Sequence, residues 1–105
     1  MCRGCYGGNP MDLHGWAARF DLLADPTRLG LLAHMHHAGP GVATVSDLAD
    51  AVGITRNAAS QALRILRDQG WVSATRDDAD GRIVRYTLVD DTVHRILHLM
   101  GARHD

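Results

Sequence analysis

The fold is constrained most by residues 46–71, which read SDLADAVGITRNAASQALRILRDQGW. This stretch predicts two short amphipathic helices separated by a break at Gly53, and the second helix runs from about Thr55 to Gln69. The apolar period then changes from 3.6 residues to 2, because residues 71–76 and 82–88 alternate around an Asp-Gly pair typical of a hairpin. The chain is therefore predicted to contain a helix-turn-helix followed by a β-hairpin.

Three further helices are predicted outside this stretch. The first carries an apolar stripe at three- and four-residue spacing, and the second begins at Asp25-Pro26, where Asp caps the helix and Pro occupies its first turn. Within the helix-turn-helix, Ser46 is predicted to cap the first short helix. The additional helices cover about residues 12–23, 26–37 and 91–100.

These elements predict a mainly α fold with a small β-hairpin wing, α+β in class. Their order is helix, helix, helix-turn-helix, hairpin, helix. Residues 1–10 contain three Gly and end in Pro, so they are expected to be a flexible N-terminal arm, and residues 11–105 are expected to be one domain. No apolar run approaches the roughly 20 residues that cross a bilayer, and the N-terminus lacks a signal peptide, which predicts a cytoplasmic protein without a membrane partner.

The charged side chains are unevenly distributed. The chain has no Lys and no Glu, and its formal net charge is −1, yet residues 53–86 hold six Arg and four Asp. A basic segment in a near-neutral chain favours an anionic partner. No Gly-rich phosphate loop, nucleophile elbow or recognisable carboxylate pair is present, so we do not expect an enzyme.

The polar face of the second short helix matches the chemistry of a DNA major groove. Arg pairs with guanine, Asn and Gln pair with adenine, and Ser and Thr bind base edges or phosphate. The hairpin adds basic side chains that can follow the phosphate backbone, although the acidic residues at its tip predict a wing that only grazes DNA. We expect Arg82 and Arg85 on opposite faces of the hairpin. The alternative is an ordinary solvated helix face. The candidate DNA-binding residues are Thr55, Arg56, Asn57, Ser60, Gln61, Arg64, Arg76, Arg82 and Arg85.

The stretches LLADPTRLGLL (22–32), VSDLADAVGITRNAASQALRILRDQGWV (45–72) and GRIVRYTLVDD (81–91) resemble the ArsR/SmtB family of bacterial winged helix-turn-helix regulators. This resemblance implies a homodimer, formed through the first and last helices, that binds a near-palindromic double-stranded DNA operator. Two apolar stripes are consistent with a dimer, because we do not expect one subunit to bury them alone. They consist of Leu13, Trp16 and Phe20 in the first helix and of Val93, Ile96, Leu97 and Met100 in the last.

Many members of that family sense metal ions, but their ligand patterns are absent here. Thr44 and Ser46 stand where one pattern has cysteines, and Thr92 stands where the other has histidine. The chain offers a different set of imidazoles and carboxylates, which suits nickel, zinc or cobalt. Histidines that are merely exposed polar residues are the alternative. The candidate ligands are Asp91, His94, His98 and His104.

Two other clusters of potential ligands are present. His34, His36 and His37 close the second helix, where positive charge is favourable at the carboxyl end, and we expect structural or surface roles for them. Cys2 and Cys5 form a Cys-x-x-Cys pair that offers a redox switch or accessory ligands, or consists of inert thiols.

The sequence therefore predicts a bacterial DNA-binding transcriptional regulator whose operator binding is modulated by a transition metal ion. Two alternatives remain open at this level. One is an ArsR-type regulator that senses redox state through Cys2 and Cys5. The other is a DNA-binding regulator without a ligand, which acts with a partner protein as co-regulator.

Overall fold

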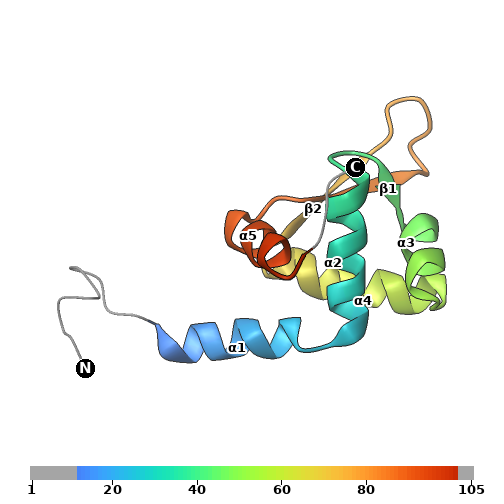
Figure 1. Cartoon of the computed structure of the whole chain (residues 1–105). Helices are drawn as coiled ribbons and strands as arrows, with labels where there is room; N and C mark the ends of the chain where they lie inside the picture. Colours follow the sequence, from blue (N-terminus) through green and yellow to red (C-terminus); the bar gives the residue numbers. More distant parts are fainter. Residues whose placement is uncertain (1–11, 102–105) are drawn as a thin grey trace, which may run out of the picture.

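The computed structural model describes residues 12–101, and in this part of the chain five helices are combined with a three-stranded antiparallel sheet whose hairpin projects from one side of the molecule (Figure 1). The mainly α fold with a β-hairpin wing is confirmed. The elements are α1 (Leu13–Leu23), α2 (Pro26–Ala38), β1 (Ala43–Thr44), α3 (Val45–Val52), α4 (Arg56–Asp68), β2 (Val72–Arg76), β3 (Val84–Leu88) and α5 (Asp91–Leu99).

The helices begin at side-chain caps. Asp25 accepts a 2.9 Å hydrogen bond from the backbone N–H of Arg28 at the start of α2, as its Asp-Pro signal predicts. The cap of α3 differs from the expected Ser46, because Thr44 and Asp47 form a reciprocal capping box. The hydrogen bonds from the backbone N–H and the side chain of Thr44 lower the pKa of the Asp47 carboxyl.

The turn between α3 and α4 is fixed by Gly53. This residue has a φ of 79°, in the left-handed region that favours glycine, and the backbone N–H groups of Gly53 and Ile54 both donate to the carbonyl of Ala49. Leu63 and Leu66 on the inner side of α4 are fully buried. Burial of that side turns the polar side of α4 toward solvent.

The wing is part of a sheet with strand order β1-β3-β2. The sequence did not predict β1, whose Ala43 and Thr44 pair with Tyr86 and Arg85 of β3. Beside this strand, the Arg85 guanidinium donates a 3.0 Å hydrogen bond to the carbonyl of Val42. The hairpin is therefore anchored to the segment that precedes α3, and this anchoring places the wing beside the helix-turn-helix.

Helix α2 lies at the centre of the molecule, and α5 packs beside it (Figure 1). The expectation that Val93 and Leu97 of α5 need a second subunit for burial is wrong, because they are 2% and 0% exposed in the core of one subunit. Helix α2 provides the centre of that core. The buried cluster comprises Leu23, Leu31, Leu32, Met35, Ala43, Leu48, Leu63, Leu66, Trp71, Val72, Val93 and Leu97.

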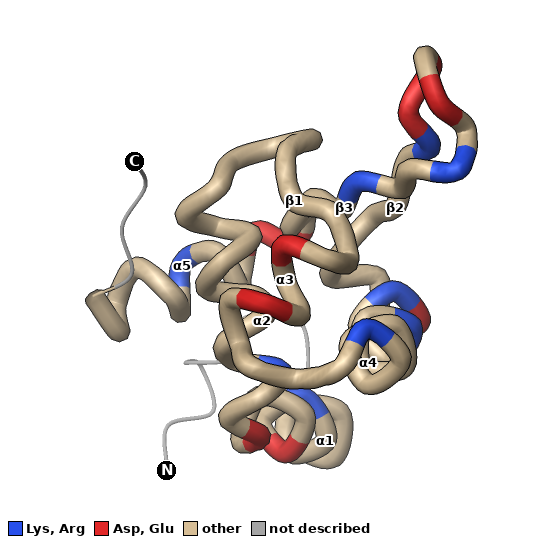
Figure 2. Tube along the Cα trace, turned by 90° about the vertical axis from the view of Figure 1, so that its right-hand side faces the viewer, with Lys and Arg blue, Asp and Glu red and all other residues tan. Residues whose placement is uncertain are grey.

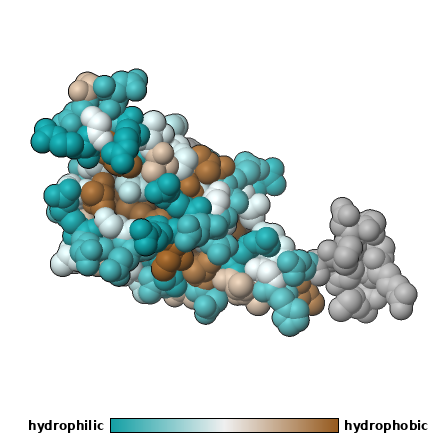
Figure 3. Space-filling view, turned by 180° about the vertical axis from the view of Figure 1, so that it is seen from behind, coloured by the Kyte–Doolittle hydropathy of each residue, from teal (hydrophilic) through white to brown (hydrophobic). Residues whose placement is uncertain are grey.

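Apolar side chains are nevertheless exposed on the two outer helices. Leu13 and Phe20 of α1 are 65% and 56% exposed, and Leu99 and Met100 at the end of α5 are 87% and 58% exposed. Figure 3 shows hydrophobic surface at the outer end of α1, next to the atoms drawn in grey. In residues 12–101, no helix is both long and apolar enough to cross a membrane.

Candidate functional site

The exposed side of α4 carries the polar residues that the sequence singled out. Thr55 caps this helix by accepting a 3.1 Å hydrogen bond from the backbone N–H of Ala58. The capped first turn fixes where the following side chains point. Five of them, Arg56, Asn57, Ser60, Gln61 and Arg64, are exposed, and the last four line one shallow depression together with Ile65.

Three arginines converge between α4 and the wing. Arg56, Arg82 and Arg85 line one hollow of about 240 Å³, together with Thr44 and Ser46 from the start of α3. We expected Arg82 and Arg85 on opposite faces of an alternating strand. Strand β3 begins only at Val84, so Arg82 lies in the preceding turn and does not follow that alternation. Figure 2 shows the basic residues of α4 and of the wing arms.

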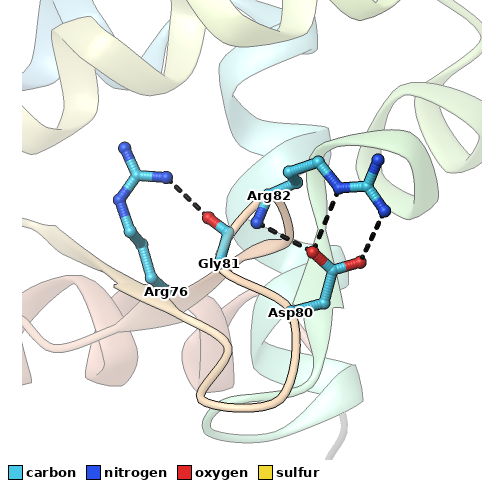
Figure 4. Close-up of polar contacts among 4 residues, drawn as sticks. All are labelled: Arg76, Asp80, Gly81 and Arg82. Atoms are coloured by element: carbon cyan, nitrogen blue, oxygen red, sulfur yellow. Dashed lines mark hydrogen bonds and ion pairs between the residues drawn. The ribbon is translucent and has the colours of Figure 1, made fainter.

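The tip of the wing neutralises part of its own charge. The Arg82 guanidinium pairs with the Asp80 carboxylate at 3.2 Å, and Arg76 donates a 2.7 Å hydrogen bond to the carbonyl of Gly81 (Figure 4). The hydrogen bonds from Arg82 lower the pKa of Asp80, so this carboxylate is charged at neutral pH. A charged acid at the wing tip opposes contact with an anionic partner.

A second constellation joins α2 to α5. The Nε2 atom of His98 lies 3.3 Å from Nε2 of His36 and 3.0 Å from Nε2 of His94. The three imidazole rings lie 4.5–4.7 Å apart between centroids. His36 is 3% exposed, and the three histidines can each turn one ligand atom toward the same ion. We refer to His36, His94 and His98 as the histidine cluster.

The histidine cluster differs from the set of ligands that the sequence suggested. His94 and His98 come together, but Asp91 lies outside the cluster, where its carboxylate faces Arg95 at 3.6 Å. His104, Cys2 and Cys5 lie outside the described residues. Sequence reasoning assigned His36 a structural or surface role. One signal pointed to it, namely a histidine on the apolar side of α2, but its partners lie about 60 positions further along the chain.

A sequence profile described as the MarR family matches residues 25–83, which are more than half of the chain. The chain belongs to the MarR family. The matched region extends from the start of α2 through the helix-turn-helix into the wing. It therefore contains the exposed side of α4 and two of the three arginines that line the hollow, Arg56 and Arg82.

Individual relatives of this MarR-family chain carry regulatory names. The HTH-type transcriptional regulator NmtR of Mycobacterium tuberculosis is 37% identical over 81 residues, which cover 77% of this chain and 62% of that protein. The transcriptional repressor SmtB homolog of Synechocystis sp. is 40% identical over 74 residues, covering 70% and 52%. The crystal structure of the AntR antimony-specific transcriptional repressor matches with a TM-score of 0.74 and 30% identity, covering 95% of this chain and 89% of that one.

Each of these three matched proteins is named a transcriptional regulator or repressor. They include a homolog of SmtB, which supports the resemblance to the ArsR/SmtB group. The chain spans between about half and three-fifths of the length of the curated relatives that it matches.

Proposed function

We propose that the chain is an ArsR/SmtB-type transcriptional regulator of the bacterial cytoplasm, which binds operator DNA as a homodimer and changes its affinity for DNA when it binds a transition metal ion. The observation that carries this proposal is the exposed polar side of α4, flanked by the hollow that Arg56, Arg82 and Arg85 line. The helix supplies base-reading side chains, and the hollow supplies charge for the adjacent phosphates.

The chemistry of α4 matches direct reading of base pairs. In a helix-turn-helix the second helix enters the major groove, and the residues near its N-terminus lie closest to the bases. Arg56 and Asn57 occupy the first turn of α4, and Gln61 and Arg64 follow on the exposed side. Each good bidentate pair between such a side chain and a base is worth about 1–3 kcal/mol of discrimination.

The outer helices support the proposed dimer. Phe20 of α1 and Leu99 of α5 expose large apolar side chains that the subunit itself does not cover. Burial of apolar surface contributes about 25 cal/mol per Å², which favours pairing of these helices with a second copy. Phe20→Ser should shift the protein toward monomer in analytical ultracentrifugation, whereas Val42→Ser, at a 49% exposed site in the loop before β1, should leave the dimer intact.

The metal response is supported by the histidine cluster, whose nitrogen ligands suit nickel, zinc or cobalt. For the ion to change DNA binding, the protein must have two states that differ in their affinity both for DNA and for the ion. The coupling between the two binding sites is then reciprocal. DNA therefore changes the affinity for the ion by the factor by which the ion changes the affinity for DNA.

The test is fluorescence anisotropy of the full chain with a DNA duplex that the chain has enriched from a random pool. We expect saturable binding that weakens as salt rises, because Arg contacts to phosphate release counterions. We also expect a change in the dissociation constant of about 5-fold or more on addition of Zn²⁺, Ni²⁺ or Co²⁺. Absence of binding at low salt contradicts the regulator, and equal affinity with and without every ion contradicts the metal response.

A further inference from the structure

We infer that the ion is held inside one subunit by three imidazoles, those of His36, His94 and His98, and that it thereby clamps α2 to α5. This site differs from a set of ligands confined to the last helix and tail, because one ligand comes from the core helix α2. The consequence for DNA binding rests on the proposed function, whereas the site itself does not.

The spacing of the nitrogen atoms matches a coordinated ion. With metal–nitrogen bonds of about 2.0–2.1 Å, two nitrogens are about 3.3–3.4 Å apart around a tetrahedral ion and about 2.8–3.0 Å apart around an octahedral one. The separations are 3.3 Å between Nε2 of His36 and His98 and 3.0 Å between Nε2 of His94 and His98. Both distances from His98 are therefore close to those that coordination requires, and the ligand atoms of all three residues lie within 4.8 Å of one another.

The contacts among the three rings fit a shared metal ion better than hydrogen bonds alone. Nε2 of His98 contacts the Nε2 atoms of both His36 and His94. A neutral imidazole nitrogen carries either one hydrogen or one lone pair, so this atom cannot form two full hydrogen bonds of opposite direction. An ion at the centre accepts a lone pair from all three nitrogens at once.

Space for additional ligands exists beside the cluster. His36 and His94 line a cavity of about 180 Å³, whose other walls include Met35 and Leu88. A water molecule takes about 30 Å³ of liquid volume, so the cavity can hold several. Three protein ligands with water in the remaining positions make a site that exchanges ions, in contrast to a closed four-ligand structural site.

The histidine cluster lies between α2 and α5, so a bound ion restricts how these two helices can move relative to each other. Helix α2 packs against α3 and α4, and α5 ends in the exposed Leu99 and Met100. An ion bound to His36 on one side and to His94 and His98 on the other fixes the angle between these two helices. Because α5 is part of the proposed dimer interface, this angle sets the separation of the two α4 helices in the dimer.

The experiment is a Co²⁺ titration of the full chain, followed by visible absorption, in a Cys2→Ser/Cys5→Ser background that removes the thiols. We expect one Co²⁺ per chain. Removal of a residue that only orients a metal ligand costs about 10–100-fold in metal affinity. Loss of a ligand itself should cost more, so His36→Gln and His98→Gln should each lower the affinity for Co²⁺ about 100-fold or more. His37→Gln is the matched control, because His37 is exposed on the same helix and lies outside the cluster.

Two results would overturn the site. One is unchanged Co²⁺ affinity in folded His36→Gln, and the other is an equal loss in His37→Gln. X-ray absorption of the Co²⁺ complex of the unsubstituted cluster gives a second measurement that needs no variant at the buried His36, with three imidazole ligands expected and two or fewer contradicting the assignment. Asp91→Asn should retain full affinity, and a large loss there would support the ligand set of the last helix instead.

The metal site and the regulatory function can be contradicted independently of each other. If Co²⁺ binds as expected but no duplex is bound, the regulatory function is wrong and the site stands. If DNA binds and responds to metal equally in the protein with and without His98→Gln, the regulator stands and this site is wrong.

Discussion

Helix α4 and the wing both present arginines, but they use them differently. In residues 12–101 the ion pairs are Arg82 with Asp80 and Arg95 with Asp91, so the arginines of α4 take part in none of them. In the wing, Arg76 and Arg85 also donate to the backbone carbonyls of Gly81 and Val42. The α4 arginines can therefore bind another molecule without breaking an ion pair within residues 12–101.

The affinity for DNA should depend on how firmly each arginine is already held. A wing arginine must give up a hydrogen bond or an ion pair before it reaches a phosphate, and exposed ion pairs contribute only about 0–1 kcal/mol. A wing arginine can therefore exchange its internal partner for a phosphate, but the exchange adds little to the affinity for DNA. Binding should therefore depend strongly on α4 and weakly on the wing, and substitutions in the two regions should differ in their effect.

The largest effect is expected from Arg64→Ala on the exposed side of α4. Loss of one bidentate contact to a base costs about 1–3 kcal/mol, which is a loss of about 5–150-fold in affinity for the selected duplex. Arg67→Ala is the control, because it removes the same charge nearer the C-terminal end of the helix, further from the bases. Equal losses in the two variants, measured by anisotropy, would mean that α4 contributes only charge.

An intermediate effect is expected for Thr44→Ala, which removes the cap of α3 and thereby tests how firmly the helix-turn-helix is held. Loss of a cap costs about 1 kcal/mol of unfolding free energy. In the unsubstituted chain the folded-state pKa of Asp47 is lowered, so its contribution is present above the unfolded value of 3.8 and is lost as pH falls through the lower, folded pKa. Urea unfolding at pH 7 and below pH 4 measures both quantities.

Ser46→Ala is the control for this capping box. It alters the residue that the sequence favoured as the cap, and it should leave the free energy of unfolding within about 0.5 kcal/mol of the original. A larger loss in Ser46→Ala than in Thr44→Ala would reverse the assignment of the cap.

A smaller effect, of opposite sign, is expected for Asp80→Asn at the wing tip. This substitution removes one negative charge and releases Arg82 from its ion pair, so affinity for DNA should rise about 2–5-fold, within the range of an exposed pair. Asp78→Asn removes the same charge from a nearby exposed position without releasing Arg82. Because Asp80 is ionised at neutral pH, the gain should be constant between pH 6 and 8. An equal gain in Asp78→Asn would show that net charge alone matters.

Local signals predicted most of the fold. A few neighbouring residues decide each of three features: the start of α2 at Asp25-Pro26, the turn at Gly53 and the change of period after Gly70. The structure places element boundaries within one or two positions of the predicted ones. Strand β1 could not be predicted this way. It has only two residues, and its partners in β3 lie about 40 positions further along the chain.

The sites depended more on tertiary packing. The exposed side of α4 follows from helical periodicity, so its residues could be chosen from the sequence. The histidine cluster could not, because the distance between His36 and His98 depends on how α2 and α5 pack. The same packing buries Val93 and Leu97, whose apolar stripe alone does not reveal whether its partner is the same chain or a second one.

Whether α4 reads base pairs is tested by selecting duplexes from a random pool with the unsubstituted chain and with Gln61→Ala. We expect the unsubstituted chain to enrich two half-sites in inverted orientation, about 10–10.5 base pairs or a multiple apart. We expect Gln61→Ala to relax the preference at one position of each half-site. Identical preferences in the two proteins, or no enriched sequence at all, would contradict base reading by α4.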